Sequence, residues 1–237
     1  MKITKKTPEK VEFIAEIDEE LANAIRRSAN EIDIYAIDEL ELYKNDSVLY
    51  DEIIAHRVGL IPLQKESIKT KEVTLKLSEK GPKTVYSGDM KGNAKVVFDK
   101  IPITKLEEGQ EIEFVAKGRL GKGAEHIKFS PGLVYYRHNA DIKIKNPNCA
   151  ECADACPKDV FENKDGKISI KNIQKCDLCG ACTEICQESG KECIELNKGD
   201  GIQFIVESFG MIEASKILEE SINVLNQNLD EVKKSLK

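Results

Sequence analysis

The sequence predicts an α+β protein in which both ends of the chain build one domain and two further domains are inserted between them. Near each end, a strand pattern is followed by a helix pattern. Segments of alternating, β-branched residues fill the middle of the chain. All eight cysteines lie between Cys149 and Cys193. The predicted domains are therefore residues 1–38 together with 200–237, a β-rich domain at 39–145, and a cysteine-rich domain at 146–199.

The composition argues against several classes of function. Hydrophobic residues are 41% of the 237 residues, enough for a buried core, and the net charge of −6 argues against sequence-independent binding to duplex DNA. Tryptophan is absent and aromatic residues are 5%, which disfavours a stacking surface for single-stranded nucleic acid. No apolar run reaches about 18 residues, the length of a membrane-spanning helix. We expect a cytoplasmic protein with no membrane partner and no sequence-specific contact to DNA.

The N-terminal strand and helix follow from periodicity. Residues 11–17 place alternate apolar side chains on one face, which is typical of a half-buried strand. Asp18 can cap a following helix, and the acidic residues after it suit the first turn. Apolar residues at helical spacing then predict a helix at 19–31, with Arg26 and Arg27 off its apolar stripe.

The C-terminal end repeats this order. Residues 202–207 predict a strand, and a broad apolar stripe predicts a long helix at 211–229. The stripe is wider than one small sheet needs. It is therefore either the face of a core helix or a surface that also packs against a partner chain. The residues that would face such a partner are Leu218, Ile222 and Leu225.

The middle of the chain predicts strands separated by turns that contain glycine. The predicted strands are 73–77, 95–98, 111–118 and 140–145. Each alternates apolar and polar residues or is rich in β-branched residues. These patterns indicate a β-rich inserted domain.

The cysteines form two related runs. Residues 176–186 have the spacing C-x2-C-x2-C-x3-C, and residues 149–157 have the spacing C-x2-C-x3-C-P. The bacterial ferredoxin run is C-x2-C-x2-C-x3-C-P. The first run fits this template if its leading cysteine has become Asn146.

The spacing favours an iron–sulfur cluster over zinc. A tetrahedral zinc site needs only two C-x2-C pairs, and these runs offer more cysteines than that. In proteins with two clusters, the fourth cysteine of a run binds the other cluster. Cys176, Cys179 and Cys182 would therefore bind a [4Fe-4S] cluster together with Cys156.

The second set of ligands is incomplete. It would consist of Cys149, Cys152 and Cys186, with Asn146 in place of the fourth cysteine. Asparagine is a poor ligand for iron, so this set could hold a [3Fe-4S] cluster, a [4Fe-4S] cluster with a non-cysteine ligand, or no cluster. Cys193 could supply the missing thiolate, but its place in a strand-like segment predicts a role in the small core instead.

Four segments resemble the D subunit of archaeal RNA polymerase, a family related to the N-terminal region of the bacterial polymerase α subunit. They are NAIRRSANEI at 23–32, DEIIAHRVGLIPL at 51–63, VYSGDM at 85–90 and KGRLGKGAEHIKFSPG at 117–132. These segments occur in the family's order. Together with a ferredoxin-like insert, which many archaeal members carry, the resemblance covers nearly the whole chain.

The resemblance implies a non-catalytic assembly subunit of DNA-directed RNA polymerase, active in transcription. The fold it implies is a discontinuous strand–helix dimerisation domain with a β-rich insert and a ferredoxin-like [4Fe-4S] insert. In this family the terminal domain pairs with the small subunit L, and the large catalytic subunits and small subunits N and P assemble on that heterodimer. The positions that face the large subunits are Arg26, Arg27, His56 and Arg57. Guanidinium groups there suit bidentate contacts to carboxylates.

Two other roles stay open. The cysteines alone would suit a ferredoxin-type electron carrier with an accessory domain, although such a carrier does not need the long C-terminal helix. A cluster could also stabilise a small insert with few apolar residues and make assembly sensitive to oxygen. We expect no catalytic site, because none of the three histidines lies near a serine in a nucleophile motif. Residues 118–123 also lack the spacing of a phosphate-binding loop.

Overall fold

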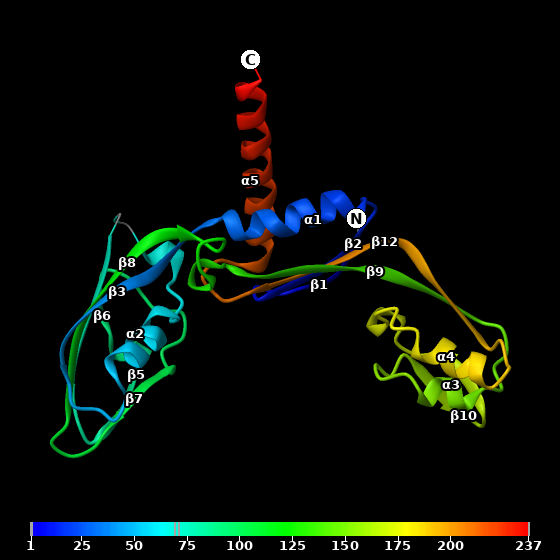
Figure 1. The fold of residues 1–237 in the computed structure, drawn as a ribbon, viewed down its shortest axis with the longest axis horizontal. Helices are drawn as coiled ribbons and strands as arrows, with labels where there is room; N and C mark the ends of the chain where they lie inside the picture. The colour runs from blue at the N-terminus through cyan, green and yellow to red at the C-terminus, as the bar shows by residue number, and fades with distance from the viewer. Residues whose placement is uncertain (1, 69, 71, 237) are drawn as a thin grey trace. The chain divides into compact units, whose positions relative to one another are not determined.

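The computed structural model describes residues 2–68, 70 and 72–236, and the chain divides into two compact units (Figure 1). The first unit contains the residues up to Lys5, Glu12–Asn23 and Tyr135–Ile205, and the second contains Lys6–Val11, Ala24–Val134 and the chain from Val206 onward. Both units contain strands and helices, so the predicted α+β class is confirmed. No described helix is long and apolar enough to cross a membrane.

One sheet combines strands from both ends of the sequence. Its order is β1 (Lys2–Lys6), β2 (Lys10–Ala15), β12 (Ile194–Ser208) and β9 (Gly132–Ile144). The rings of Phe13 and Phe204 stack with their centroids 5.2 Å apart. Both side chains are buried, so neighbouring strands are held together by aromatic packing as well as by hydrogen bonds. The strands predicted at 11–17 and 202–207 are therefore both present.

The helix predicted after the first strand is also present. It consists of α1 (Glu19–Ser28) followed by a single 3-10 turn, η1 (Ala29–Glu31). The Asp18 carboxylate accepts a hydrogen bond from the backbone N–H of Leu21 over 2.9 Å, as expected for an N-cap. The predicted start of the helix is therefore confirmed.

The second unit contains the β-rich middle of the chain. One sheet has the order β3 (Asp33–Asn45), β8 (Glu111–Lys122), β4 (Val73–Lys80) and β6 (Lys91–Gly92), and a smaller one pairs β5 (Lys83–Tyr86) with β7 (Pro102–Leu106). The helical segments are α2 (Asp51–Gly59), η2 (Lys65–Ser67), η3 (Ser87–Asp89) and η4 (Ile127–Phe129). Their common core includes Ile54, Leu75 and Phe114, which are fully buried. Apolar side chains of α2 thus cover the apolar face of strands far away in the sequence.

The strand predicted at 95–98 is wrong. Val96 makes only an isolated bridge with Leu63. The backbone of this segment bonds to a loop instead, since Val97 donates to Pro62 O over 2.9 Å and Lys95 O accepts from Gln64 N over 2.8 Å. Val96 is buried all the same. Phe98, two residues further on, is 53% exposed, so only part of the run is buried and its pairing is too short for a strand.

The C-terminal helix α5 (Ala214–Ser235) begins later and ends later than predicted. Its first turns are anchored in the second unit, because Ala214, Ile217 and Ser221 are fully buried. The helix also contacts η1, where Asn228 Nδ2 donates to Glu31 Oε2 over 2.9 Å. Its N-terminal half is therefore a core helix, as one of the two interpretations of its stripe predicts.

The cysteine-rich segment lies entirely in the first unit. Its elements are α3 (Ala150–Asp154), β10 (Phe161–Lys164), β11 (Lys167–Ile170), η5 (Ile173–Lys175) and α4 (Ala181–Glu188). The strands β10 and β11 form a hairpin, and α3 contacts both α4 and the hairpin. Cysteines make up much of the small hydrophobic core between these elements. The other buried members of this core are apolar residues such as Phe161, Ile168 and Ile194.

Candidate metal centre and interaction surfaces

The predicted complete set of ligands lies partly on a tightly bent loop. Between η5 and α4, Leu178 has φ 61° and Gly180 has φ 82°. Glycine adopts this left-handed conformation without steric cost, whereas it is uncommon for leucine. Cys179 stands between the two bends, and Cys182 follows in the first turn of α4. The short loop therefore curls rather than extends.

All four cysteines of this set line one pocket. The pocket is bounded by Cys156, Cys176, Cys179 and Cys182, with Val160 and Leu196 among the apolar residues around them. Cys182 is buried, Cys156 and Cys176 are half-buried, and Cys179 is exposed. The structure thus brings together four free thiols that are separated in the sequence, with one edge open to solvent.

The electrostatics of this pocket favour a bound cation. Burial raises the pKa of Cys182 most, and the charges of Cys156, Cys176 and Cys179 raise it further. Burial also raises the pKa of Cys176, partly opposed by a backbone hydrogen bond at Leu178. The thiolates are therefore close enough to repel one another. A metal or cluster would remove this penalty, because its positive charge stabilises deprotonated sulfur.

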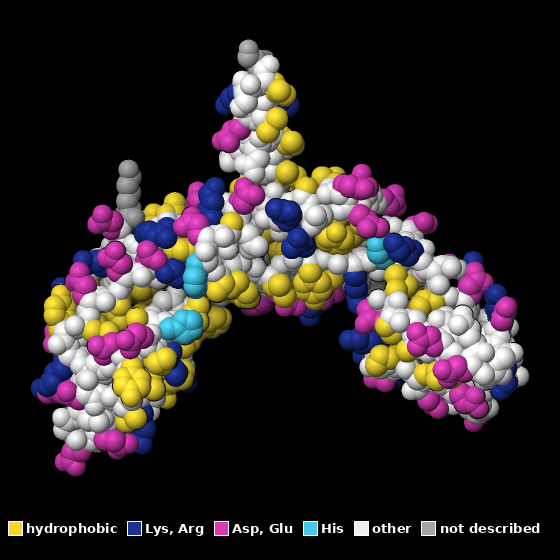
Figure 2. Space-filling view, viewed as in Figure 1, with side chains coloured by type: hydrophobic (Ala, Val, Ile, Leu, Met, Phe, Trp, Pro, Cys, Tyr) yellow, Lys and Arg dark blue, Asp and Glu magenta, His cyan; other side chains and the backbone are white. Residues whose placement is uncertain are grey.

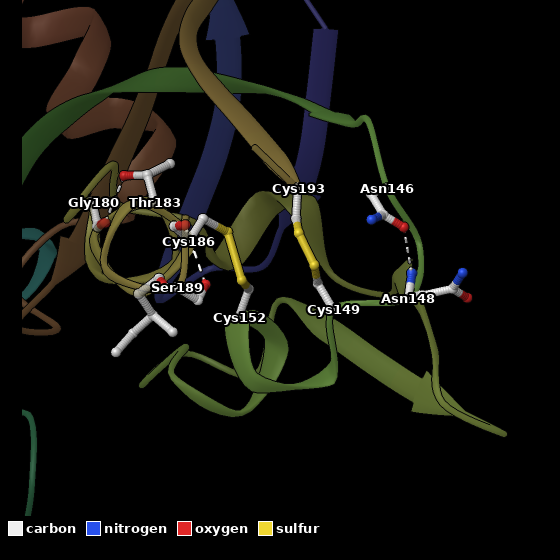
Figure 3. Close-up of a disulfide and its surroundings, with 10 residues drawn as sticks. Asn146, Asn148, Cys149, Cys152, Gly180, Thr183, Cys186, Ser189 and Cys193 are labelled. Atoms are coloured by element: carbon white, nitrogen blue, oxygen red, sulfur yellow. Dashed lines mark hydrogen bonds between the residues drawn. A yellow bond between two sulfur atoms is a disulfide. The ribbon is translucent and has the colours of Figure 1, made fainter. Parts of the chain in front are cut away.

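The other four cysteines form a second, more deeply buried group. Cys149, Cys152, Cys186 and Cys193 are each no more than 4% exposed. The sulfur atoms of Cys149, Cys152 and Cys193 all lie within 4.8 Å of one another. The structure joins the group as two disulfides, Cys149–Cys193 and Cys152–Cys186 (Figure 3). The predicted residues of the incomplete set are thus together, and Cys193 is with them.

Cys193 is the residue that sequence reasoning placed only in part. It is fully buried in the small core, as expected. Its sulfur, however, faces the sulfur of Cys149, to which it is joined (Figure 3). The available signal was its position directly before a strand, seven positions after Cys186. Spacing alone could not show which cysteine lies across that strand.

Both groups suit the chemistry of an iron–sulfur cluster. Each offers four sulfur atoms, and thiolate is the ligand that holds such clusters in proteins. Four thiolates also suit tetrahedral zinc, so the donor chemistry fits a thiolate-bound metal of either kind. The assignment of Cys156, Cys176, Cys179 and Cys182 as one set remains a prediction.

The basic residues predicted to face other subunits lie in the second unit. Arg26 is half-buried and Arg27 is exposed, both in the last turn of α1. His56 and Arg57 are exposed in the last turn of α2, where the Arg57 guanidinium donates a hydrogen bond to Pro102 O. Basic residues suit the last turn of a helix, whose dipole is negative there. Three of these four side chains are accessible to a partner.

A row of apolar side chains continues along α5 beyond its buried start. Its members recur three or four residues apart, which is one helix face, and we call them the α5 stripe: Leu218, Ile222, Leu225, Leu229 and Val232. Leu218 and Leu225 are half-buried, whereas Ile222, Leu229 and Val232 are 40%, 51% and 57% exposed. Figure 2 shows apolar side chains along this helix. The C-terminal half of the stripe is thus exposed in this chain.

The comparison with protein families identifies the class of protein. Residues 32–132 match the family described as the RNA polymerase Rpb3/RpoA insert domain. This range begins directly after η1 and runs from β3 through η4, which is the β-rich part of the second unit. The chain therefore contains a domain of the kind found in α-like subunits of RNA polymerase.

Whole-chain comparisons identify the particular family. The chain is 36% identical to DNA-directed RNA polymerase subunit Rpo3 of Thermococcus kodakarensis, over 97% of this chain and 94% of the relative. It is 34% identical to Rpo3 of Pyrococcus horikoshii, over 97% and 95%, and 32% identical to Rpo3 of Archaeoglobus fulgidus, over 90% and 88%. The chain belongs to the Rpo3 family, the archaeal D-subunit family of DNA-directed RNA polymerase. The predicted resemblance is confirmed, and a polymerase subunit accords with the expected lack of a catalytic site of its own.

Proposed function

We propose that this chain is an assembly platform of DNA-directed RNA polymerase that pairs with subunit L. The observation that carries the proposal is its similarity to Rpo3 proteins along nearly the whole chain. The domains we propose are residues 1–38 with 200–237 for pairing, 39–145 for contacts to other subunits, and 146–199 for a ferredoxin-like module. The chain contributes surfaces rather than catalytic groups.

The α5 stripe supports a helical partner. Ile222, Leu229 and Val232 expose apolar side chains on one helix face, and contact with water makes such a face unfavourable. The N-terminal part of the same helix is anchored by buried Ile217 and Ser221, so the stripe is held on a fixed element. A strand–helix subunit such as L would cover it with its own helix.

The basic helix ends support contacts to the large catalytic subunits. Arg27, His56 and Arg57 are exposed at the C-terminal turns of α1 and α2. Arginine pairs well with carboxylates of a partner because its donors form a planar fork. We assign these residues and Arg26 to the large-subunit surface, and we assign the small subunits N and P to the assembled platform rather than to a particular residue.

The pairing is tested by co-expressing the chain with subunit L under anaerobic conditions. Size-exclusion chromatography with multi-angle light scattering is expected to give one peak with the mass of a 1:1 heterodimer. Two peaks with the masses of the separate chains at physiological salt would contradict the proposal. The experiment needs no other polymerase subunit, so it isolates the pairing step.

We further propose that Cys156, Cys176, Cys179 and Cys182 hold one [4Fe-4S] cluster, whose main role is to stabilise the cysteine-rich segment. The shared pocket and the mutual repulsion of the thiolates support it. The small size of the core between α3, α4 and the hairpin also supports it, because small modules need a metal or disulfide to stay folded.

The cluster proposal is tested on protein purified without oxygen. Iron and acid-labile sulfide are expected in equal amounts, at about four atoms of each per chain or more. Cys182→Ala is expected to remove about four of the iron atoms. Protein with zinc and no sulfide would contradict the cluster. If a low-potential donor reduces the cluster rapidly and reversibly, and the chain does not bind subunit L, the electron-carrier alternative would be favoured.

A further inference from the structure

We propose that Cys193 replaces the cysteine that is missing at position 146, so that Cys149, Cys152, Cys186 and Cys193 form a complete four-thiolate site for a second iron–sulfur cluster. This inference rests on the iron–sulfur role proposed above. It assigns a ligand that lies outside both cysteine runs. It also supplies the thiolate that the sequence template lacks at Asn146.

The backbone register places Cys193 directly beside the missing position. The carbonyl oxygen of Cys193 accepts hydrogen bonds from Lys145 N over 2.8 Å and from Asn146 N over 3.2 Å. Residues 145 and 146 follow β9, and Cys193 precedes β12, so the two positions lie opposite each other on neighbouring strands. In the ferredoxin template, the ligand comes from position 146, which follows β9. The side chain at position 193 can therefore reach the same site from the start of the neighbouring strand β12.

The side chain of Asn146 has a different role. Its Oδ1 accepts a hydrogen bond from the backbone N–H of Asn148 over 3.0 Å (Figure 3). This is the local turn that asparagine commonly stabilises. Asn146 is exposed, whereas Cys193 is fully buried. The residue at the template position thus shapes the turn into the first run, and the buried sulfur comes from Cys193.

An internal repeat in the module supports the same assignment. The carbonyl oxygen of Val160 accepts hydrogen bonds from Lys171 N and Asn172 N over 2.8 and 3.0 Å. This repeats the pattern of Cys193 with Lys145 and Asn146, and each acceptor immediately precedes a strand, β10 or β12. Val160 lines the pocket of the first cysteine set. By this correspondence, the side chain at position 193 lines the second site as Val160 lines the first. A cysteine at this position supplies a ligand where Val160 supplies only an apolar contact.

The four sulfur atoms are gathered at one place in the fold. Three lie within 4.8 Å of one another, and Cys186 is joined to Cys152. The two disulfides are the oxidised form of this ligand set. A dithiol reductant gives each disulfide two electrons and two protons, yielding four thiols that lose their protons when they bind iron. The site combines two cysteines from each half of the module.

The decisive experiment compares single and double variants of the full chain, co-expressed with subunit L and purified without oxygen. Wild-type protein is expected to hold about eight iron and eight sulfide atoms per chain, and Cys193→Ala about four to seven. A surviving three-iron cluster would be visible by electron paramagnetic resonance after oxidation. Adding Asn146→Cys to Cys193→Ala restores the template and is expected to restore about eight iron atoms.

Each other outcome has a definite meaning. Wild-type protein with about four iron atoms, unchanged by Cys193→Ala, would overturn this inference and leave the first cluster intact. Iron content of about eight that survives Cys193→Ala would also overturn it. Mass spectrometry that finds both disulfides in anaerobic protein containing about four iron atoms would assign Cys193 a purely covalent role. Absence of iron altogether would overturn the cluster proposal as a whole.

Discussion

Asp38 on β3 shows how single residues support the second unit. Its carboxylate accepts hydrogen bonds from Lys128 and, over 2.7 Å, from Arg119 Nε. The hydrogen bond from Lys128 lowers the pKa of Asp38 most, followed by that from Arg119. The guanidinium of Arg119 also lies 4.8 Å from the centre of the buried Phe129 ring. These contacts tie η4 to the β3–β8 sheet through charged groups at its surface.

The lowered pKa of Asp38 predicts a pH dependence of stability. Because the folded chain favours the charged carboxylate, this contribution is present above the ordinary pKa of aspartate, near 4, and is lost as pH falls through the lowered value. The side chain is 29% exposed, so solvent screening limits the contribution to about 1 kcal/mol or less. Asp38→Asn should destabilise the protein by up to this amount at pH 7.

Urea denaturation of wild type and Asp38→Asn from about pH 7 to pH 2 measures this effect, with the lower limit below the ordinary pKa of aspartate. The difference in free energy of unfolding is expected to shrink toward acid pH. Asp33→Asn, an exposed residue of the same strand, is the matched control and should show no comparable change. A difference that is constant over the pH range would refute the role assigned to the Asp38 carboxylate.

Residues in the cysteine-rich segment show what spacing predicts and what it misses. The template grouped Cys156 with the three cysteines of the following run, and all four line one pocket. It also expected a defect at Asn146. It could not place Cys193 beside Asn146, because that depends on which residues lie opposite each other at the ends of β9 and β12. Hydrogen-bond register between distant strands is a property of the fold and leaves no local pattern in the sequence.

At the scale of elements, the sequence located the helix α1 closely, whereas the strand predicted at 95–98 is absent. The Asp18 cap and the apolar periodicity located α1 closely. The segment 95–98 had an equally clear strand pattern, yet its backbone pairs with a loop. A helix satisfies its hydrogen bonds internally, so local sequence nearly determines it. A strand needs a partner elsewhere in the chain, which local sequence does not specify.

The α5 stripe gives a prediction at the scale of one helix. Changing both Leu229 and Val232 to Glu places charges on its exposed half, where a partner helix would have to bury them. We expect the affinity for subunit L to fall at least about tenfold, which corresponds to about 1.4 kcal/mol. The fold should be retained, because both side chains are exposed in this chain. Biolayer interferometry and circular dichroism measure the two effects.

The matched control changes polar residues on the same helix. Asn226 and Gln227 are exposed on α5 and lie outside the stripe. Asn226→Glu with Gln227→Glu adds the same charge to the helix. Equal loss of binding in both double variants would mean that net charge, and not the apolar face, determines the pairing.

The cysteine-rich module gives a second prediction at this scale. Cys176→Ser with Cys179→Ser removes two thiolates from the first set, and a module with so small a core depends on such a constraint. We expect faster amide hydrogen exchange across residues 146–198 and unchanged exchange in α5. Hydrogen-exchange mass spectrometry checks both regions in one experiment. Unchanged protection in the module would show that its fold does not depend on this cluster.

At the scale of the whole molecule, the two units carry different chemistry. The second unit contains the Rpb3/RpoA insert domain, the basic helix ends and the α5 stripe. The first contains all eight cysteines.

The central claim is that this chain is an assembly platform, and reconstitution of the polymerase from separately purified subunits tests it most directly. Native mass spectrometry would follow the large catalytic subunits with and without the pre-formed heterodimer of this chain and subunit L. We predict that the large subunits join one complex only when the heterodimer is present, and that Arg27→Ala with Arg57→Ala reduces its yield. A complete, transcriptionally active complex that assembles equally well without this chain would contradict the account.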